Sequence, residues 1–172
     1  AYPFNGTEPS GPATTWKMLW DENCLYFAFD CEDDDLVAPV RKRDEPVFFD
    51  DSVEMFLLPE PRHRVYWEIV VAPGDLVYDS LNCKLLESWG ADLDPRQDVA
   101  GLRCASTFRG TLNHAGDEDR GYVIEVAVPF ASLPEFTRCP PRPGDQLRLM
   151  LVRLDRSRGV FSAHAFRPLL AW

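Results

Sequence analysis

Three predicted strands each carry one glutamate inside an otherwise apolar run. Glu54 interrupts SVEMFLL, Glu68 interrupts VYWEIVV, and Glu125 interrupts YVIEVAV. Because alternate residues of a strand point to opposite faces, Glu54 lies opposite the apolar face formed by Val53 and Met55. A half-buried carboxylate needs an arginine, a hydroxyl or a ligand as its partner. These three positions are therefore the first candidates for chemistry.

The run QLRLMLVRLD at 146–155 offers partners within the chain. Arg148 and Arg153 can each neutralise a glutamate on a neighbouring strand, which gives a sheet face with Glu–Arg pairs. That interpretation applies best to Glu68 and Glu125. For Glu54 the alternative is a ligand whose hydroxyl groups donate hydrogen bonds to the carboxylate.

Catalysis is a weaker interpretation of the same carboxylates. Glu54 and Glu68 on adjacent strands would stand about 5 Å apart, near the separation found in retaining glycosidases. Such an enzyme needs a deep cleft, and the histidines at 63, 114 and 164 are scattered along the chain. The motifs GxSxG, GxxxxGK[ST] and HExxH are absent from the sequence. We therefore predict a protein that is not an enzyme.

Two acidic runs raise the question of a metal site. DCEDDD occupies 30–35 and NHAGDED occupies 113–119, and neither has the spacing of an EF-hand loop. Charge runs usually face water, so solvated acidic turns are the favoured interpretation.

Short runs with a period of two residues fill most of the chain and predict the elements that position these side chains. Gly and Pro residues separate the runs, and only 130–136 has the character of a helical turn. We expect an all-β, two-sheet antiparallel sandwich at 16–172, preceded by an N-terminal arm or lead-in at 1–15. The predicted strands are 16–20, 24–31, 51–58, 65–72, 76–86, 99–109, 121–129, 146–155 and 160–166.

Composition limits the partners. The formal net charge of −10 disfavours nucleic acid and anionic membranes, and no apolar run is long enough to span a bilayer. The five cysteines form an odd set without a Cys-x-x-Cys pair. They are expected to be buried, reduced thiols rather than disulfides or zinc ligands.

The ordered set of motifs resembles the family 9 carbohydrate-binding modules. The opening strand pair, the central motif with an aromatic before an Asp-rich strand, and the closing half all follow the family's order over about 16–168. The segments that carry the resemblance are LWDENCLYFAFDCEDDDL, RDEPVFFDDSVEMFLLP, VYWEIVVAPGDLVYD, DRGYVIEVAVPFASL and CPPRPGDQLRLMLVRLD.

The resemblance implies a β-sandwich that binds a sugar ring or polysaccharide chain end without catalysis. Two tryptophans of the family enclose the ring, and the glutamate of the central motif accepts bonds from its hydroxyls. Glu54 matches that glutamate, and Phe48 or Phe49 falls at the first tryptophan.

The second tryptophan has no counterpart, since FSAHAFRP at 161–168 contains none. Trp89 and Phe166 are the candidate replacements as stacking platforms. Losing both tryptophans weakens a sugar sandwich by about 1–3 kcal/mol, so weak or degenerate binding is expected.

Further expectations also follow from the resemblance. No cofactor is expected, although family members can carry structural calcium, and other domains of a larger protein are candidate partners. The association with secreted glycosidases favours an extracellular or periplasmic location, whereas the cysteines favour the cytoplasm. Two alternatives remain: an interaction domain that has lost sugar binding, and a haem-binding sandwich that uses ligands from Met18, Met55, Met150 and His164.

Overall fold

A computed structural model gives the fold of the chain. It describes residues 2–3, 12–58, 65–83, 91–94, 97–133, 141–142, 144–156, 162–166 and 169–171, with side chains placed in 12–58, 65–82, 97–133, 141–142 and 144–156. The described elements are two sheets and two short 3-10 helices. The strands are β1 (Tyr2–Pro3), β2 (Thr14–Trp20), β3 (Cys24–Cys31), β4 (Ser52–Leu58), β5 (Val65–Ala72), β6 (Leu76–Cys83), β7 (Ala91–Asp94), β8 (Arg103–Phe108), β9 (Tyr122–Pro129), β10 (Gln146–Asp155), β11 (Ser162–Phe166) and β12 (Leu169–Ala171). The 3-10 helices are η1 (Val47–Phe49) and η2 (Phe130–Ser132).

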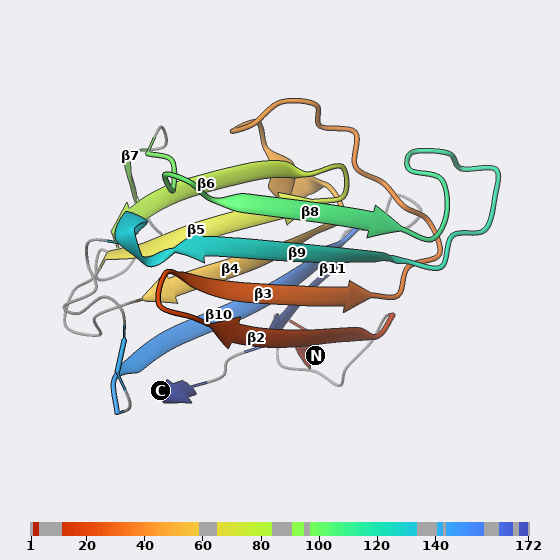
Figure 1. The fold of residues 1–172 in the computed structure, drawn as a ribbon. Coiled ribbons are helices and arrows are strands. Elements are labelled where there is room, and N and C mark those ends of the chain that lie inside the picture. The colour runs from red at the N-terminus through yellow and green to blue at the C-terminus, as the bar shows by residue number, and fades with distance from the viewer. Residues whose placement is uncertain are drawn as a thin grey trace.

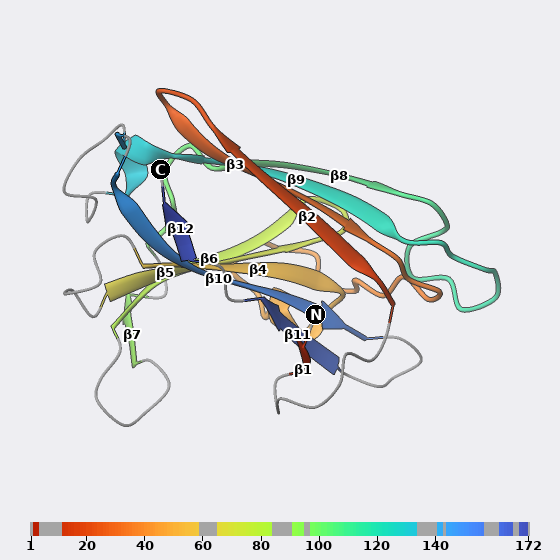
Figure 2. The ribbon, with the colours of Figure 1, turned by 90° about the horizontal axis from the view of Figure 1, so that it is seen from below.

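The two sheets lie face to face as the layers of a sandwich. The larger sheet has the order β1-β11-β10-β4-β5-β6-β7, with β12 also paired to β10, and the smaller has the order β2-β3-β9-β8. In Figure 1 the smaller sheet faces the viewer and the larger lies behind it, while Figure 2 shows the two layers from below. The predicted all-β sandwich is confirmed.

The core lies between the layers because each sheet turns one apolar face inward. From the larger sheet, β4 contributes Val53, Met55 and Leu57, which are all fully buried. From the smaller sheet, β3 and β9 contribute alternate residues such as Phe27 and Ile124. The periodicity of two in the sequence therefore sets both the strands and the side of the sheet that each residue occupies.

The strand predictions agree with the structure over most of the chain. The runs at 24–31, 65–72 and 146–155 are strands with those bounds. β8 begins at Arg103 rather than at 99, and the predicted turn at 130–136 is described only as η2. Four short elements were not predicted, because two to four residues are too few to show a periodicity. They are β1, β7, β12 and η1.

The start of β9 depends on a glycine that brings two strands close together. Gly121 has φ +119°, and a Cβ at this position would lie 1.9 Å from the carbonyl oxygen of Cys31. We expect Gly121→Ala to lower the free energy of unfolding by roughly 2–3 kcal/mol in urea denaturation. Gly144→Ala is the matched control, since Gly144 has φ +97° with nothing within 4 Å. Equal losses in both variants would show that backbone conformation, not the close approach, sets the cost.

Cys24, Cys31 and Cys104 are free thiols. The first two are buried, as expected for reduced cysteines, whereas Cys104 is only half-buried, contrary to that expectation. In the part of the chain that the structure describes, no helix has the length and apolar character that a membrane crossing requires.

Candidate functional site

The outer face of the larger sheet, which points away from the smaller sheet, carries Glu54. In one cross-strand row, Val152 of β10, Glu54 of β4, Val70 of β5 and Tyr78 of β6 follow one another. Residues two positions along these strands point to the same face and form the neighbouring row, which consists of Met150, Phe56, Glu68 and Ser80. Glu54 therefore stands in the middle of the sheet rather than at an edge.

Glu54 is largely buried in the sheet. Its side chain is 7% exposed. Among the residues whose side chains are described, none forms a hydrogen bond or ion pair with it. Burial, together with the negative charge of Glu68, raises the pKa of Glu54 to about 8. A buried carboxyl group of this kind is costly in the free protein, which is typical of a binding site rather than of a structural position.

Glu68 is a diagonal neighbour of Glu54, not its direct cross-strand partner. The register pairs Glu54 with Val70 and Phe56 with Glu68. Diagonal positions are separated by roughly 7–8 Å between Cα atoms, more than the direct spacing assumed from the sequence. The amide nitrogen of Asn82 donates hydrogen bonds to Glu68 Oε2 at 3.1 Å and to Ser80 Oγ at 2.8 Å. Asn82 thereby fixes the orientation of the second carboxylate.

Two groups of aromatic rings border these polar side chains. Phe48 of η1 packs edge-on against Tyr78, with ring centroids 5.4 Å apart, and against Phe49 at 4.9 Å. Phe56 and Tyr66 form the second pair, with centroids 6.0 Å apart. Phe48, Phe56, Tyr66 and Tyr78 are half-buried, while Phe49 is 58% exposed. The outer face thus presents carboxylates between aromatic surfaces.

Arg153 does not face a strand glutamate, contrary to the Glu–Arg pairing expected from the sequence. Arg153 is opposite Val53, so it points into the sandwich, where its Nη2 lies 2.6 Å from Asp33 Oδ2. Arg148 is on the outer face, opposite Leu58, and is exposed. Val152 is the cross-strand neighbour of Glu54. Arg148 precedes Val152 by four residues, so the two positions are about 13 Å apart along the strand.

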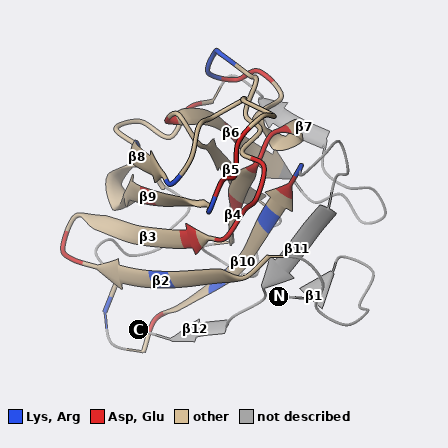
Figure 3. Cartoon of the chain, turned by 90° about the vertical axis from the view of Figure 1, so that its right-hand side faces the viewer, with Lys and Arg blue, Asp and Glu red and all other residues tan. Residues whose placement is uncertain are grey.

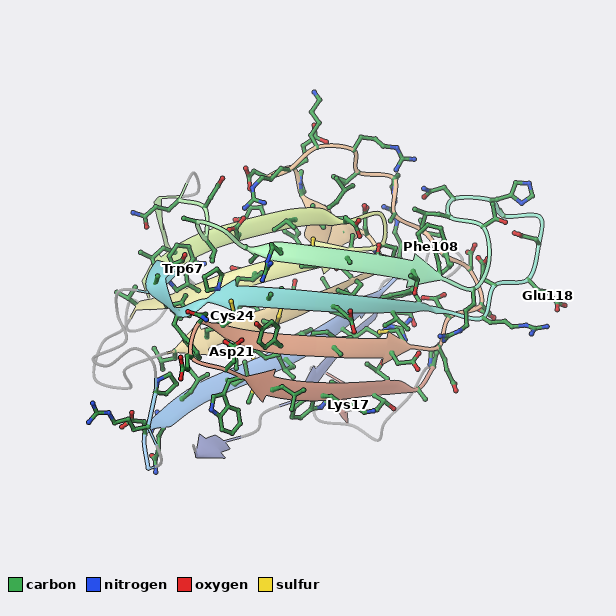
Figure 4. The ribbon with its side chains drawn as sticks, in the orientation of Figure 1. Lys17, Asp21, Cys24, Trp67, Phe108 and Glu118 are labelled. Carbon is green, nitrogen blue, oxygen red and sulfur yellow. The ribbon has the colours of Figure 1, made fainter. Side chains whose placement is uncertain are left out.

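Glu125 is not half-buried as expected. It is exposed on the outward side of the smaller sheet, opposite Ala28 and Ala105. Lys17 of β2, labelled in Figure 4, is opposite Ala28 on the same sheet and is also exposed. Glu125 is therefore a natural control position for experiments on Glu54.

The structure does not bring all four predicted site residues together. Glu54 and Phe48 are on the same side of the larger sheet, and both adjoin Val70, which packs in a cluster with Phe48. The register pairs Phe166 with Leu151, a residue of the core-facing row. Trp89 lies outside the described residues.

Sequence reasoning did not assign the remaining residues of this face to the site. Phe56 and Tyr66 share the strand parity of Glu54 and Glu68, so the alternation could have identified them. Tyr78 depends on the register between β5 and β6, which no local pattern fixes.

The methionines that could hold a haem are divided between different surfaces. Met18 and Met55 pack in the core between the sheets, whereas Met150 is opposite Phe56 on the outer face. The side chain of His164 lies outside the described set. These positions do not favour a common haem pocket.

A buried acidic cluster tests the expectation of structural calcium. Asp33, Asp51 and Asp155 each place one carboxylate oxygen within 4.8 Å of the others, and all three are buried. Figure 3 shows the acidic segments that meet at the ends of β3 and β10 and the start of β4. Arg153 supplies one positive charge, with its Nη2 2.6 Å from Asp33 and 3.8 Å from Asp155. Burial raises the pKa of Asp33 to about 6 and that of Asp51 to about 7. Three carboxylates supply hard oxygen donors of the kind that calcium prefers.

The acidic turns are not simply solvated, contrary to the sequence interpretation. Asp33 and Asp119 are buried, and the Asp119 carboxylate accepts hydrogen bonds from the amides of Leu36 and Thr111 at 2.7 and 2.8 Å. A second acidic group, Asp44, Asp79 and Asp98, is less suited to a metal, because the Arg43 guanidinium forms ion pairs with all three carboxylates.

Comparisons with known proteins identify relatives of this fold. The structure of a putative carbohydrate-binding protein from Bacteroides uniformis aligns with a TM-score of 0.69 at 10% identity, covering 93% of this chain and 71% of that one. A carbohydrate-binding module of family 9 from Caldicellulosiruptor kristjanssonii, in complex with glucose, aligns with a TM-score of 0.58 at 14% identity, covering 94% and 69%. No curated protein sequence matches the chain. The family model described as carbohydrate family 9 binding domain-like matches residues 3–160, which confirms the resemblance inferred from the motifs. The chain belongs to this family of carbohydrate-binding domains.

Proposed function

We propose that this protein binds a sugar ring on the outer face of its larger sheet, with Glu54 as the central hydrogen-bonding group. The observation that carries the proposal is the burial of Glu54 at 7% exposure without a hydrogen bond or ion pair to any described side chain. Sugar hydroxyls are suitable partners, because two adjacent hydroxyls can donate to one carboxylate. The glucose complex of the Caldicellulosiruptor module supports the choice of ligand class.

The aromatic side chains supply the second part of the recognition. The C–H faces of a sugar ring pack on aromatic rings, and this chain offers Phe48 with Phe49 and Tyr78 at one side, and Phe56 with Tyr66 at the other. Several phenyl and phenol rings would replace the two tryptophans of the better-known family members. Binding is non-catalytic in this account, as expected of an accessory module that keeps a glycoside hydrolase close to its polysaccharide.

Calorimetric titration with glucose, xylose, cellobiose and xylobiose tests the proposal. At pH 9, above the raised pKa of Glu54, we expect saturable binding to the native chain and at least a tenfold loss of affinity in Glu54→Ala, since charge-assisted hydrogen bonds contribute about 1.5–3 kcal/mol. Glu125→Ala is the matched control, because Glu125 is an exposed strand glutamate on the other sheet. Unchanged affinity in Glu54→Ala would place the sugar elsewhere.

The second candidate function is an interaction domain without sugar binding. The edge strand β2 favours it, since Leu19 is 70% exposed and Trp20 is 48% exposed. Absence of heat with every sugar at millimolar concentration would support this candidate and contradict the first.

We also propose that Asp33, Asp51 and Asp155 hold a structural calcium ion. The three closely spaced, buried carboxylates support this role. Bound there, calcium would add its positive charge to that of Arg153 and would tie the end of β3 to β4 and β10.

A further inference from the structure

Apolar side chains surround the carboxyl group of Glu54. Its neighbours in the cross-strand row are Val152 and Val70, and the next row along β4 and β10 contains Phe56 and Met150. Glu54 is largely buried, and among the residues whose side chains are described none donates a hydrogen bond to it. Because the removal of water disfavours the charged form of a carboxyl group, this position favours a protonated Glu54 in the free protein.

The titratable and charged side chains that share this face with Glu54 come from three neighbouring strands. β5 contributes Glu68 and Tyr66, β6 contributes Tyr78, and β10 contributes Arg148 at about 13 Å along the strand. β4 has no other titratable residue, and η1 has none. Burial is the larger cause of the raised pKa of Glu54, and the charge of Glu68 is the smaller one. Burial acts on Glu54 whatever partners Glu68 has.

The arginines of the segments next to this face direct their charges elsewhere. Arg43, in the loop before η1, forms an ion pair with Asp79. Arg41 donates a hydrogen bond to a carbonyl of the same loop at 2.8 Å, and Arg156 donates to a carbonyl of η1 at 3.1 Å. In the part of the chain whose side chains are described, no cation contributes to the pKa of Glu54.

A bound sugar would reverse this preference for the protonated form. Its hydroxyl groups donate hydrogen bonds to a carboxylate, and such bonds stabilise the ionised form and lower its pKa. A ligand that binds the ionised form more tightly than the neutral form shifts the equilibrium towards the ionised form. Sugar binding and ionisation at this position are therefore coupled.

We propose that a sugar bound on this face displaces the proton of Glu54, so that the affinity for sugar rises with pH through the neutral range. This inference rests on the proposed sugar-binding function. The proton passes to the buffer, while the sugar hydroxyls keep their own protons. Because the pKa of free Glu54 is about 8, the affinity should rise by up to about tenfold per pH unit below this pH and level off above it.

Titration calorimetry at pH 7 in PIPES and in imidazole, two buffers with different ionisation enthalpies, counts the protons released. The probe is whichever of glucose, xylose, cellobiose and xylobiose binds most tightly at pH 9. We expect nearly one proton to be released per sugar at pH 7, and an affinity at pH 6 at least tenfold weaker than at pH 8. Equal heats in the two buffers, or equal affinities at pH 6 and pH 8, would overturn the inference.

Carbon-13 NMR of the glutamate carboxyl groups assigns the proton to Glu54, whose signal is identified by its loss in Glu54→Gln. In the native chain at pH 7, this signal should be that of a protonated carboxyl group without sugar and of a carboxylate with saturating sugar. The native spectra keep the test decisive if Glu54→Gln binds no sugar. Glu125→Gln is the matched control and should release as many protons as the native chain. A Glu54 signal that sugar leaves unchanged would contradict the assignment.

The outcomes separate this inference from the function beneath it. Sugar binding without proton release would overturn the coupling and leave the proposed function intact. Failure of all four sugars to bind at pH 9, where Glu54 is ionised, would contradict both the proposed function and this inference.

Discussion

Replacing Arg153 by methionine is expected to lower the free energy of unfolding by about 3–5 kcal/mol. Arg153 is 1% exposed. It donates to Asp33 and to the Glu32 carbonyl at 2.6 Å each, and its guanidinium carbon lies 5.5 Å from the centre of the Tyr122 ring. Methionine retains much of the volume but leaves the buried Asp33 and Asp155 carboxylates without this cation. Urea denaturation measures the change.

Arg148→Met is the control for that experiment, because Arg148 belongs to the same strand but is exposed. It should change stability by less than about 0.5 kcal/mol. A loss in Arg153→Met no larger than in the control would show that the buried acidic cluster does not depend on Arg153.

Stability is expected to fall by up to roughly 7 kcal/mol between pH 5 and pH 8 when a chelator removes divalent ions. Asp33, Asp51 and Glu54 have pKa values of about 6, 7 and 8 in the folded chain, above their ordinary values of 3.8, 3.8 and 4.5. The folded state therefore binds more protons than the unfolded state in this range. Stability is greatest below the ordinary values and is lost as pH rises through the raised ones.

Calcium and Glu54→Gln separate the two sources of this pH dependence. Saturating calcium should abolish the contribution of Asp33 and Asp51, because the ion favours the ionised carboxylates. Glu54→Gln should abolish the contribution of the outer face. Urea denaturation at both pH values, with calcium or chelator, gives the four comparisons. The assignment would be contradicted if the stability of the native chain rose from pH 5 to pH 8 in chelator. It would also be contradicted if calcium left the pH dependence of Glu54→Gln unchanged.

The sequence predicted the long strands because their apolar residues alternate over seven to ten positions, as in β4 and β10. The same alternation placed Glu54 on the face opposite Val53, Met55 and Leu57, and the structure agrees. The alternation within one strand was therefore sufficient to predict that strand and the face on which each of its residues lies.

Pairing between strands could not be predicted in the same way. Arg148 and Arg153 are five residues apart and so must lie on opposite faces, but which acid each meets depends on register and on loops. Asp33 is 120 residues from Arg153 along the chain, and only the closed sandwich brings them together. The Asn82–Glu68 bond likewise depends on the hairpin between β5 and β6.

A crystal structure of the chain with the sugar that binds most tightly in the titrations is the most direct test of the central claim. The account predicts a sugar ring on the outer face of the larger sheet, within hydrogen-bond distance of Glu54 and in contact with the Phe48–Tyr78 or Phe56–Tyr66 rings. A sugar on the smaller sheet, or one without contact to Glu54, would contradict it.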